Sequence, residues 1–175
     1  MSVKRTKPQI VYQFKKKNIF LVKEDQVLPN GYRVIKEIVV HPGAVLIVPM
    51  LDAHRVLMLR QYRSSIKKYL YEFPAGTINP GEKILPCAKR ELMEETGYAG
   101  KVFRKMGEIY PVPGYSTELI YIYRAEDLRP QAVAKDPDEI IDVHQLTLAE
   151  VRDLFRKGKI VDAKTICALA FCRLL

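Results

Sequence analysis

The chain has 175 residues, of which 48% are apolar, and a formal net charge of +9. This length suits a single compact domain with one appended element, and the apolar fraction is sufficient for a sizeable core. No stretch approaches the roughly 18 consecutive apolar residues of a membrane span, and no apolar signal-peptide core follows the basic start, so a membrane partner is not expected.

The number and spacing of the cysteines indicate the cellular compartment. Cys87, Cys167 and Cys172 are odd in number and show no C-x-x-C spacing. This pattern argues against a disulfide framework and against a structural zinc site. We therefore predict reduced thiols in a cytoplasmic protein, because reducing compartments keep cysteines free.

Basic residues cluster near the start of the chain, at Lys4, Arg5, Lys7 and Lys15-Lys16-Lys17. One interpretation is nucleic-acid binding through phosphate neutralisation. The other is a solvated surface that also attracts small anionic nucleotides. We favour the second interpretation, because the chain has no Trp and no aromatic RNA-binding motif.

The first 41 residues predict three strands, rich in β-branched and aromatic residues, with a turn signal at Pro29-Asn30-Gly31. The predicted strands are residues 9–14, 19–27 and 32–40. We interpret residues 1–41 as a small antiparallel sheet set apart from a domain that spans residues 42–175. The alternative is that these strands belong to the main sheet.

The next strands are predicted at residues 44–50, 56–60 and 71–76. Arg63 follows the second of them and could bind a phosphate or carboxylate through two hydrogen bonds, although an ordinary surface charge is equally compatible with its spacing. Pro74 and Gly76 shape a tight turn at the end of the third strand. We expect this turn to point the carbonyl of Ala75 toward the helix that follows, as an extra metal ligand.

A short helix is predicted to begin near residues 83–86 and to end at Gly97, because Pro86 is tolerated in a first turn and glycine commonly caps a helix C-terminus. Its expected apolar stripe consists of Leu85, Ala88 and Leu92.

The same helix carries an unusual acidic load, with Glu91, Glu94 and Glu95 close together and Glu82 just upstream. Like charges three or four residues apart destabilise a helix by roughly 0.2–0.5 kcal/mol per pair. Arg90 can pair with Glu94 and steady this face. A solvated acidic surface is one interpretation, but Mg²⁺ would offset the repulsion, since it binds carboxylates together with substrate phosphates.

The remaining elements are predicted as strands at 101–109, 119–125 and 140–146 and helices at 147–157 and 163–174. A proline-rich loop separates the first two strands, and a charged loop, residues 129–141, precedes the third. Thr147 and Glu150 form a capping-box pattern, and Asp162 can cap the last helix.

The acidic helix and its flanks carry one extended motif, made of Gly76, Glu82, Arg90-Glu91-Leu92, Glu94-Glu95 and Gly97. This motif resembles the Nudix box, with every specified position filled. The resemblance implies an α/β (α+β) fold, a mixed-sheet α/β/α sandwich. It also implies hydrolysis of a nucleoside diphosphate linked to another group. Mg²⁺, or Mn²⁺ in its place, would be held by Glu91, Glu94 and Glu95, with support from Glu82.

Within that family the chain resembles the ADP-ribose pyrophosphatase subgroup. Pro113 lies 16 residues after Gly97, and Pro113-Gly114 followed by Glu118 is similar to the subgroup. Further similar segments are residues 41–45, 60–63 and 72–76. The resemblance implies hydrolysis of ADP-ribose to AMP and ribose 5-phosphate. The substrate residues that it implies are Arg63, Glu72, Gly114 and Glu118, with Arg63 on the distal phosphate.

In this subgroup an acidic loop closes over the substrate and supplies a catalytic carboxylate. The corresponding candidates here are Asp136, Asp138 and Glu139, with Arg90 counted as the catalytic arginine of the box. Glu139 aligns with a carboxylate that reaches the metal, whereas Pro137 occupies the position expected for the general base. All three carboxylates therefore stay open as the base.

The resemblance also implies a homodimer, because the small N-terminal sheet of the subgroup packs against a partner chain or swaps onto it. Two alternatives to ADP-ribose hydrolysis stay open. One is a Nudix hydrolase of another nucleotide sugar, such as GDP-mannose. The other is an RNA-binding protein that keeps the Nudix fold without catalysis, which the complete set of box carboxylates opposes.

Overall fold

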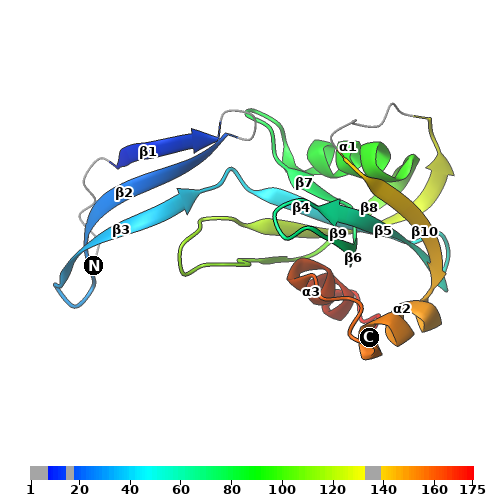
Figure 1. Cartoon of the computed structure of the whole chain (residues 1–175). Helices are drawn as coiled ribbons and strands as arrows, with labels where there is room; N and C mark the ends of the chain where they lie inside the picture. Colours follow the sequence, from blue (N-terminus) through cyan, green and yellow to red (C-terminus); the bar gives the residue numbers. More distant parts are fainter. Residues whose placement is uncertain (1–7, 15–17, 133–138) are drawn as a thin grey trace.

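The computed structural model describes residues 8–14, 18–132 and 139–175. A layered body of strands and helices carries a three-stranded sheet that projects from one end, at the left of Figure 1. The predicted mixed α/β architecture is confirmed.

The projecting sheet consists of β1 (Gln9–Phe14), β2 (Ile19–Val27) and β3 (Arg33–Val40), which pair antiparallel in the order β1-β2-β3. The predicted N-terminal antiparallel sheet is therefore present. Its third strand begins one residue later than expected, because Tyr32 closes the preceding turn through its carbonyl, which accepts from Leu28 N at 2.8 Å.

The proline-rich loop ties β3 to the main body. Val39 N donates to the carbonyl of Tyr115 at 2.8 Å, and the carbonyl of Val39 accepts from Thr117 N at 3.0 Å. Just beyond, Ala44 N donates to the carbonyl of Leu119 at 2.9 Å. The chain therefore enters the main body alongside this loop.

Within residues 18–132 and 139–175, two sheets form the main body. In the mixed sheet, ordered β7-β4-β9-β8, only β4 and β9 run parallel; the other sheet is antiparallel and ordered β10-β5-β6. The strands are β4 (Ala44–Pro49), β5 (Arg55–Arg63), β6 (Lys68–Glu72), β7 (Ala75–Thr77), β8 (Tyr98–Ile109), β9 (Ile120–Pro130) and β10 (Ile141–Thr147).

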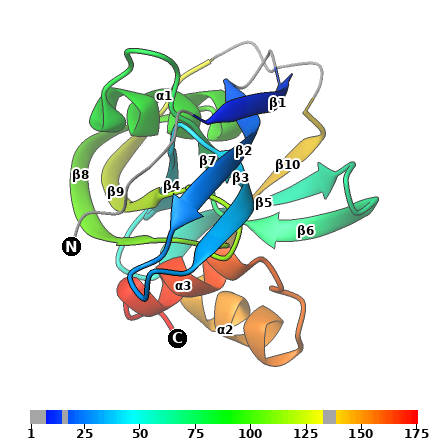
Figure 2. The same cartoon turned by 90° about the vertical axis from the view of Figure 1, so that its left-hand side faces the viewer.

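In the described part of the chain, three helices cover these sheets, namely α1 (Ile84–Thr96), α2 (Leu148–Arg156) and α3 (Ala163–Phe171). Figure 2 shows α1 on one side of the strands and α2 and α3 on the other, which gives the predicted α/β/α sandwich. None of the helices in the described residues has the length and apolar character that crossing a membrane requires.

Strand β4 shows why the layers form. Its alternate residues point to opposite faces, as strand geometry requires. Ala44, Leu46 and Val48 join the core beneath α2 and α3, whereas Val45 and Ile47 join the core beneath α1. All five are buried, so this strand connects both hydrophobic cores.

The predicted caps of the three helices are confirmed, but α3 ends at Phe171 and not near residue 174. Gly97 terminates α1 in the left-handed conformation at φ 74°. Thr147 and Glu150 form the capping box of α2, and the Asp162 side chain caps α3 by accepting from Thr165 N.

Two further local expectations were wrong. The strand predicted over residues 71–76 is two strands, because Phe73 and Pro74 carry the chain from a pairing with β5 to a pairing with β4. Leu85 is not part of the packing stripe of α1, since it is 39% exposed, and the buried Cys87 takes that place beside Ala88.

Candidate active site

Helix α1 buries two carboxylates on the face that packs against the sheets. Its buried residues include Ala88, Glu91, Leu92 and Glu95, spaced three and four residues apart. Glu94 lies between them and is more exposed, with 42% of its side chain accessible. The apolar packing of α1 therefore holds Glu91 and Glu95 in place, while Glu94 borders solvent.

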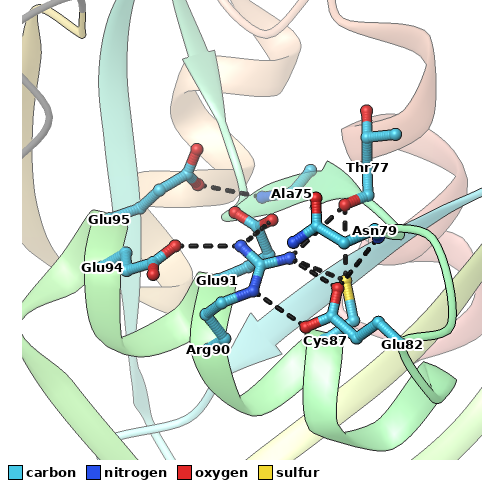
Figure 3. Close-up of polar contacts among 9 residues, drawn as sticks. All are labelled: Ala75, Thr77, Asn79, Glu82, Cys87, Arg90, Glu91, Glu94 and Glu95. Atoms are coloured by element: carbon cyan, nitrogen blue, oxygen red, sulfur yellow. Dashed lines mark hydrogen bonds and ion pairs between the residues drawn. The ribbon is translucent and has the colours of Figure 1, made fainter. Parts of the chain in front are cut away.

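Arg90 gathers the carboxylates around it, as Figure 3 shows. Its Nε and Nη2 donate to Glu82 at 2.9 and 2.8 Å. Its Nη1 donates to Glu91 at 2.6 Å and to Glu94 at 2.9 Å. The hydrogen bonds from Arg90 are the main cause that lowers the pKa of Glu82 to about 2. The geometry gives Arg90 the task of orienting acidic side chains.

Gly76 faces the carboxylate of Glu91 directly. A Cβ atom at residue 76 would lie 2.0 Å from Cδ of Glu91 and 2.1 Å from its Oε1, closer than atoms can pack. The glycine that begins the motif is therefore required because Glu91 occupies the space of a side chain.

Glu95 is fixed from the opposite strand. Its Oε2 accepts from Ala75 N at 2.9 Å (Figure 3), and the residue is only 4% exposed. Burial raises the pKa of Glu95 to about 8 and that of Glu91 to about 7. The negative charge of Glu139 contributes to both upward shifts, so Glu139 lies near enough to interact with Glu91 and Glu95.

This donor set fits a divalent cation. Each buried carboxylate uses one oxygen in the bonds above, Oε1 of Glu91 and Oε2 of Glu95, so the other oxygen of each can bind a metal. A bound cation would also lower these two raised pKa values, which result mainly from burial of the carboxylates. Among the described residues, no group of three or more His, Cys, Asp or Glu side chains is arranged as a complete metal site.

Ala75 contacts the acidic face through its N–H group. The expectation that its carbonyl also ligates the metal stays a prediction.

Arg63 and Glu72, both predicted at the substrate, bind each other. Arg63 Nε and Nη2 donate to the two oxygens of Glu72 at 2.8 and 2.6 Å, and Lys164 Nζ donates to Oε2 of Glu72. Burial acts strongly against the charge of Glu72, yet these two cations outweigh it and lower the pKa. The positive charge of Arg63 opposes part of the rise in the pKa of Glu95, so this ion cluster lies close to α1.

The structure places Gly114 and Glu118 in the loop before β9. Gly114 is exposed, and a Cβ atom added to it would meet no heavy atom of the described residues within 4 Å. Glu118 lies 3.8 Å from Nε2 of His41. In the described part of the chain, no hydrogen bond or ion pair joins either residue to the α1 carboxylates.

The predicted catalytic loop is only partly described. Asp136 and Asp138 lie outside the described residues, as does Pro137. Glu139 is described and exposed, and its charge acts on Glu91 and Glu95.

Sequence reasoning missed the contribution of α3. Thr165 Oγ1 accepts from Phe73 N at 3.0 Å, next to the contact between Lys164 and Glu72. These residues are about 90 positions apart in the chain, so no local spacing connects them. The available signal was Lys164 itself, since a cation in the first turn of a helix opposes the helix dipole.

Comparisons with known proteins agree with this geometry. Residues 40–169 match the NUDIX domain. The ADP-ribose pyrophosphatase of Bacillus subtilis (strain 168) is 36% identical over 163 residues, covering 92% of this chain and 88% of the relative. The methanol dehydrogenase activator of Bacillus methanolicus is 36% identical over 153 residues, covering 86% and 83%.

A GDP-mannose pyrophosphatase of Yersinia enterocolitica is 32% identical over 141 residues, covering 75% of this chain and 73% of the relative. A crystal structure of an ADP compounds hydrolase superposes with a TM-score of 0.83 at 27% identity, covering 99% of this chain and 93% of that one. The chain therefore belongs to the Nudix family and is a Nudix hydrolase.

Proposed function

We propose that this enzyme hydrolyses the pyrophosphate bond of ADP-ribose, giving AMP and ribose 5-phosphate, with Mg²⁺ as cofactor and Mn²⁺ as a substitute. The observation that carries the proposal is the pair of buried carboxylates with raised pKa values, Glu91 and Glu95, on which the charges of Glu139 and Arg63 act. ADP-ribose is favoured because the Bacillus subtilis relative is an ADP-ribose pyrophosphatase and matches nearly the whole chain.

The chemistry requires charge compensation, because anionic phosphate oxygens repel an attacking water. Nudix hydrolases generally use divalent metals, which shield this charge and lower the pKa of a bound water. Glu91, Glu94 and Glu95 supply the oxygen donors for such ions, with Glu82 as a support held by Arg90. The carbonyl of Ala75 completes the proposed donor set.

A carboxylate near this cluster would accept the proton of the attacking water. Glu139 is the described candidate, and Asp136 and Asp138 are the others. Arg90 contributes indirectly by orienting Glu91 and Glu94. Arg63, positioned by Glu72, would bind the distal phosphate, and the loop with Gly114 and Glu118 would contact the remainder of the substrate.

A phosphate-release screen tests the substrate. Purified enzyme with Mg²⁺ receives ADP-ribose, GDP-mannose, UDP-glucose, NADH, diadenosine polyphosphates and 5′-triphosphate RNA, with a phosphatase that releases phosphate from the products. We expect preferential turnover of ADP-ribose, with AMP and ribose 5-phosphate as products. Preferential turnover of another compound would contradict the substrate assignment while keeping the metal site.

GDP-mannose is the second candidate, because one relative is a GDP-mannose pyrophosphatase. Its coverage of this chain is lower than that of the Bacillus subtilis relative, so we rank it behind ADP-ribose. The third alternative is RNA binding without catalysis. Binding of RNA that depends on salt but not on Mg²⁺, together with no turnover of any nucleotide, would support it.

We also propose a homodimer formed through a dimerisation region, residues 1–41, that is distinct from the catalytic domain, residues 42–175. The match to the NUDIX domain begins at residue 40, which supports this division. Strand β1 exposes Ile10, Tyr12 and Phe14, each close to half exposed or more, and such a patch favours a protein partner. A monomer in sedimentation at micromolar concentration would contradict the proposal.

A cytoplasmic location accords with the cysteines. All three are free thiols, and Cys87 and Cys172 are buried. Fractionation of cells that produce the protein tests this location, and recovery in an extracellular or membrane fraction would contradict it.

A further inference from the structure

The first turn of α3 contains a lysine, Lys164, at a position where the helix dipole disfavours a positive charge. Lys164 lies two residues after the capping residue Asp162, and the positive end of the helix dipole repels a cation there. Asp162 partly offsets this cost, because its Oδ1 accepts from Lys164 Nζ at 2.8 Å while its Oδ2 accepts from Thr165 N at 3.0 Å. A charge that is unfavourable for its own helix indicates a role in contacts outside that helix.

The other partner of Lys164 is Glu72, at the end of β6. The Glu72 side chain is only 1% exposed and that of Lys164 is 17% exposed, so the ion pair is shielded from solvent. The neighbouring Thr165 accepts from the N–H of Phe73 at 3.0 Å in a buried bond. Two consecutive residues of α3 therefore hold Glu72 and Phe73, at the point where the chain leaves β6 for the acidic site.

Glu72 passes this restraint to Arg63. The carboxylate occupies Nε and Nη2 of the guanidinium, a fork geometry that fixes its plane. Nη1 takes part in neither bond, so it can donate to an anion. The side chain of Arg63 is 35% exposed, so its neighbours do not enclose it fully, and its charge acts on Glu95.

From these contacts we infer that Lys164 is a positioning residue that acts through Glu72 to hold Arg63 ready for a phosphate group of the substrate. The assignment rests on the proposed function, in which Arg63 binds the distal phosphate. Lys164 supplies Glu72 with a second cation, so Arg63 is not the sole counter-charge of a buried carboxylate. Without Lys164, Glu72 loses one of the two cations that hold its carboxylate in place, so the guanidinium bound to it loses its fixed direction as well.

The test compares Lys164→Met with the conservative variant Lys164→Arg and with Lys157→Met as the control. Lys157 is an exposed lysine of the α2 end, whose ion pair with Asp153 lies on the surface. Lys164→Gln replaces the methionine variant if that variant does not fold. Two readouts need no turnover: the affinity for inorganic pyrophosphate with Mg²⁺, and the NMR signal of Arg63 Nε–H, assigned by its loss in Arg63→Lys.

We expect Lys164→Met to weaken pyrophosphate binding by about tenfold, as loss of a supporting contact behind a binding group does, and to shift the Arg63 signal. Lys164→Arg should restore most of the affinity, and Lys157→Met should change neither readout. In the Arg63→Lys background, Lys164→Met should cause no further loss, because the two residues act as a unit.

Unchanged affinity and an unchanged Arg63 signal in folded Lys164→Met would overturn the inference, and so would losses that multiply in the double variant. The proposed function fails by a different result, namely no hydrolysis of ADP-ribose by the unaltered enzyme. The two failures are therefore distinguishable.

Discussion

Gly76 and Glu91 are packed against each other so closely that residue 76 has no space for a side chain. A Cβ atom there would lie 2.0 Å from Cδ and 2.3 Å from Oε2 of the carboxylate. The contact joins β7 to the buried face of α1, and it places a carboxylate with a raised pKa against backbone. Steric exclusion thus contributes to the geometry of the proposed metal site.

Gly76→Ala should therefore damage both the fold and the site. The added methyl group must displace Glu91 or separate β7 from α1, and overpacking of this kind costs typically about 1–3 kcal/mol of unfolding free energy. Chemical denaturation measures that loss, and the phosphate-release assay measures the accompanying loss of activity. Gly114→Ala is the stability control, because a Cβ there meets no atom of the described chain within 4 Å. Equal stability of the two variants would contradict the steric argument.

Glu95→Gln should abolish most activity and leave the fold intact. The amide keeps the size of the side chain and can still accept from Ala75 N, but it loses the charge that a divalent ion requires. We expect a loss on the order of 100-fold or more in kcat, comparable to the removal of one transition-state-stabilising group. Glu108→Gln is the matched control, since Glu108 pairs with Lys105 on β8 and both side chains are about half exposed. Turnover of Glu95→Gln at the level of the unaltered enzyme would refute the metal assignment.

The stability of the metal-free enzyme should fall as the pH rises. Burial raises the pKa of Glu91 to about 7 and of Glu95 to about 8, whereas both titrate near 4.3, roughly, in an unfolded chain. Between these pKa values the folded state retains protons that the unfolded chain releases. The stabilisation that these two groups contribute is therefore fully present below about pH 4 and is lost as the pH rises to about 8. Thermal unfolding in the presence of a chelator measures this trend.

Divalent cations should reverse the trend. Because metal binding requires ionised carboxylates, Mg²⁺ should raise the melting temperature more at about pH 8.5 than at about pH 5.5, with release of protons. In Glu95→Gln both the pH dependence and the response to Mg²⁺ should shrink. A metal-free enzyme that gains stability between these pH values would contradict the assigned pKa shifts.

Features that depend on helix geometry were predictable from sequence. The start of α1 near Lys83, its end at Gly97 and the pairing of Arg90 with Glu94 all follow from spacings within one helix. The layered fold was predictable for a similar reason, since the strand at β4 and the caps of α2 and α3 each depend on a short stretch of sequence.

Features that depend on docking between distant segments were not predictable. Which face of α1 is buried depends on the packing of Cys87 against the sheet. The apolar stripe predicted from the sequence included Leu85 instead and so did not indicate this face. The contact of Lys164 with Glu72 joins residues 92 positions apart, and only the assembled layers bring them together. Arg63 could be selected as an anion-binding side chain, but its fixed orientation depends on that tertiary contact.

Single substitutions in the acidic loop should identify which carboxylate is the general base. Glu139 is the candidate whose charge raises the pKa of Glu91 and Glu95, so Glu139→Gln should lower kcat and also lower the pKa of those two carboxyl groups. Asp136→Asn and Asp138→Asn should lower kcat only if either side chain takes the proton of the attacking water. Asp127→Asn is the control, because Asp127 lies on β9 with an exposed side chain.

The pH profile of kcat distinguishes a base from a metal-holding carboxylate. Loss of the base removes the acid limb of the profile, since no group remains to titrate as the acceptor of the proton. Loss of a carboxylate that holds a metal retains that limb and instead raises the Mg²⁺ concentration needed for half-maximal activity. Because Pro137 occupies the expected position of the base, we expect Glu139→Gln to remove the acid limb. A retained limb in this variant, together with its loss in Asp136→Asn or Asp138→Asn, would transfer the role of base to that aspartate.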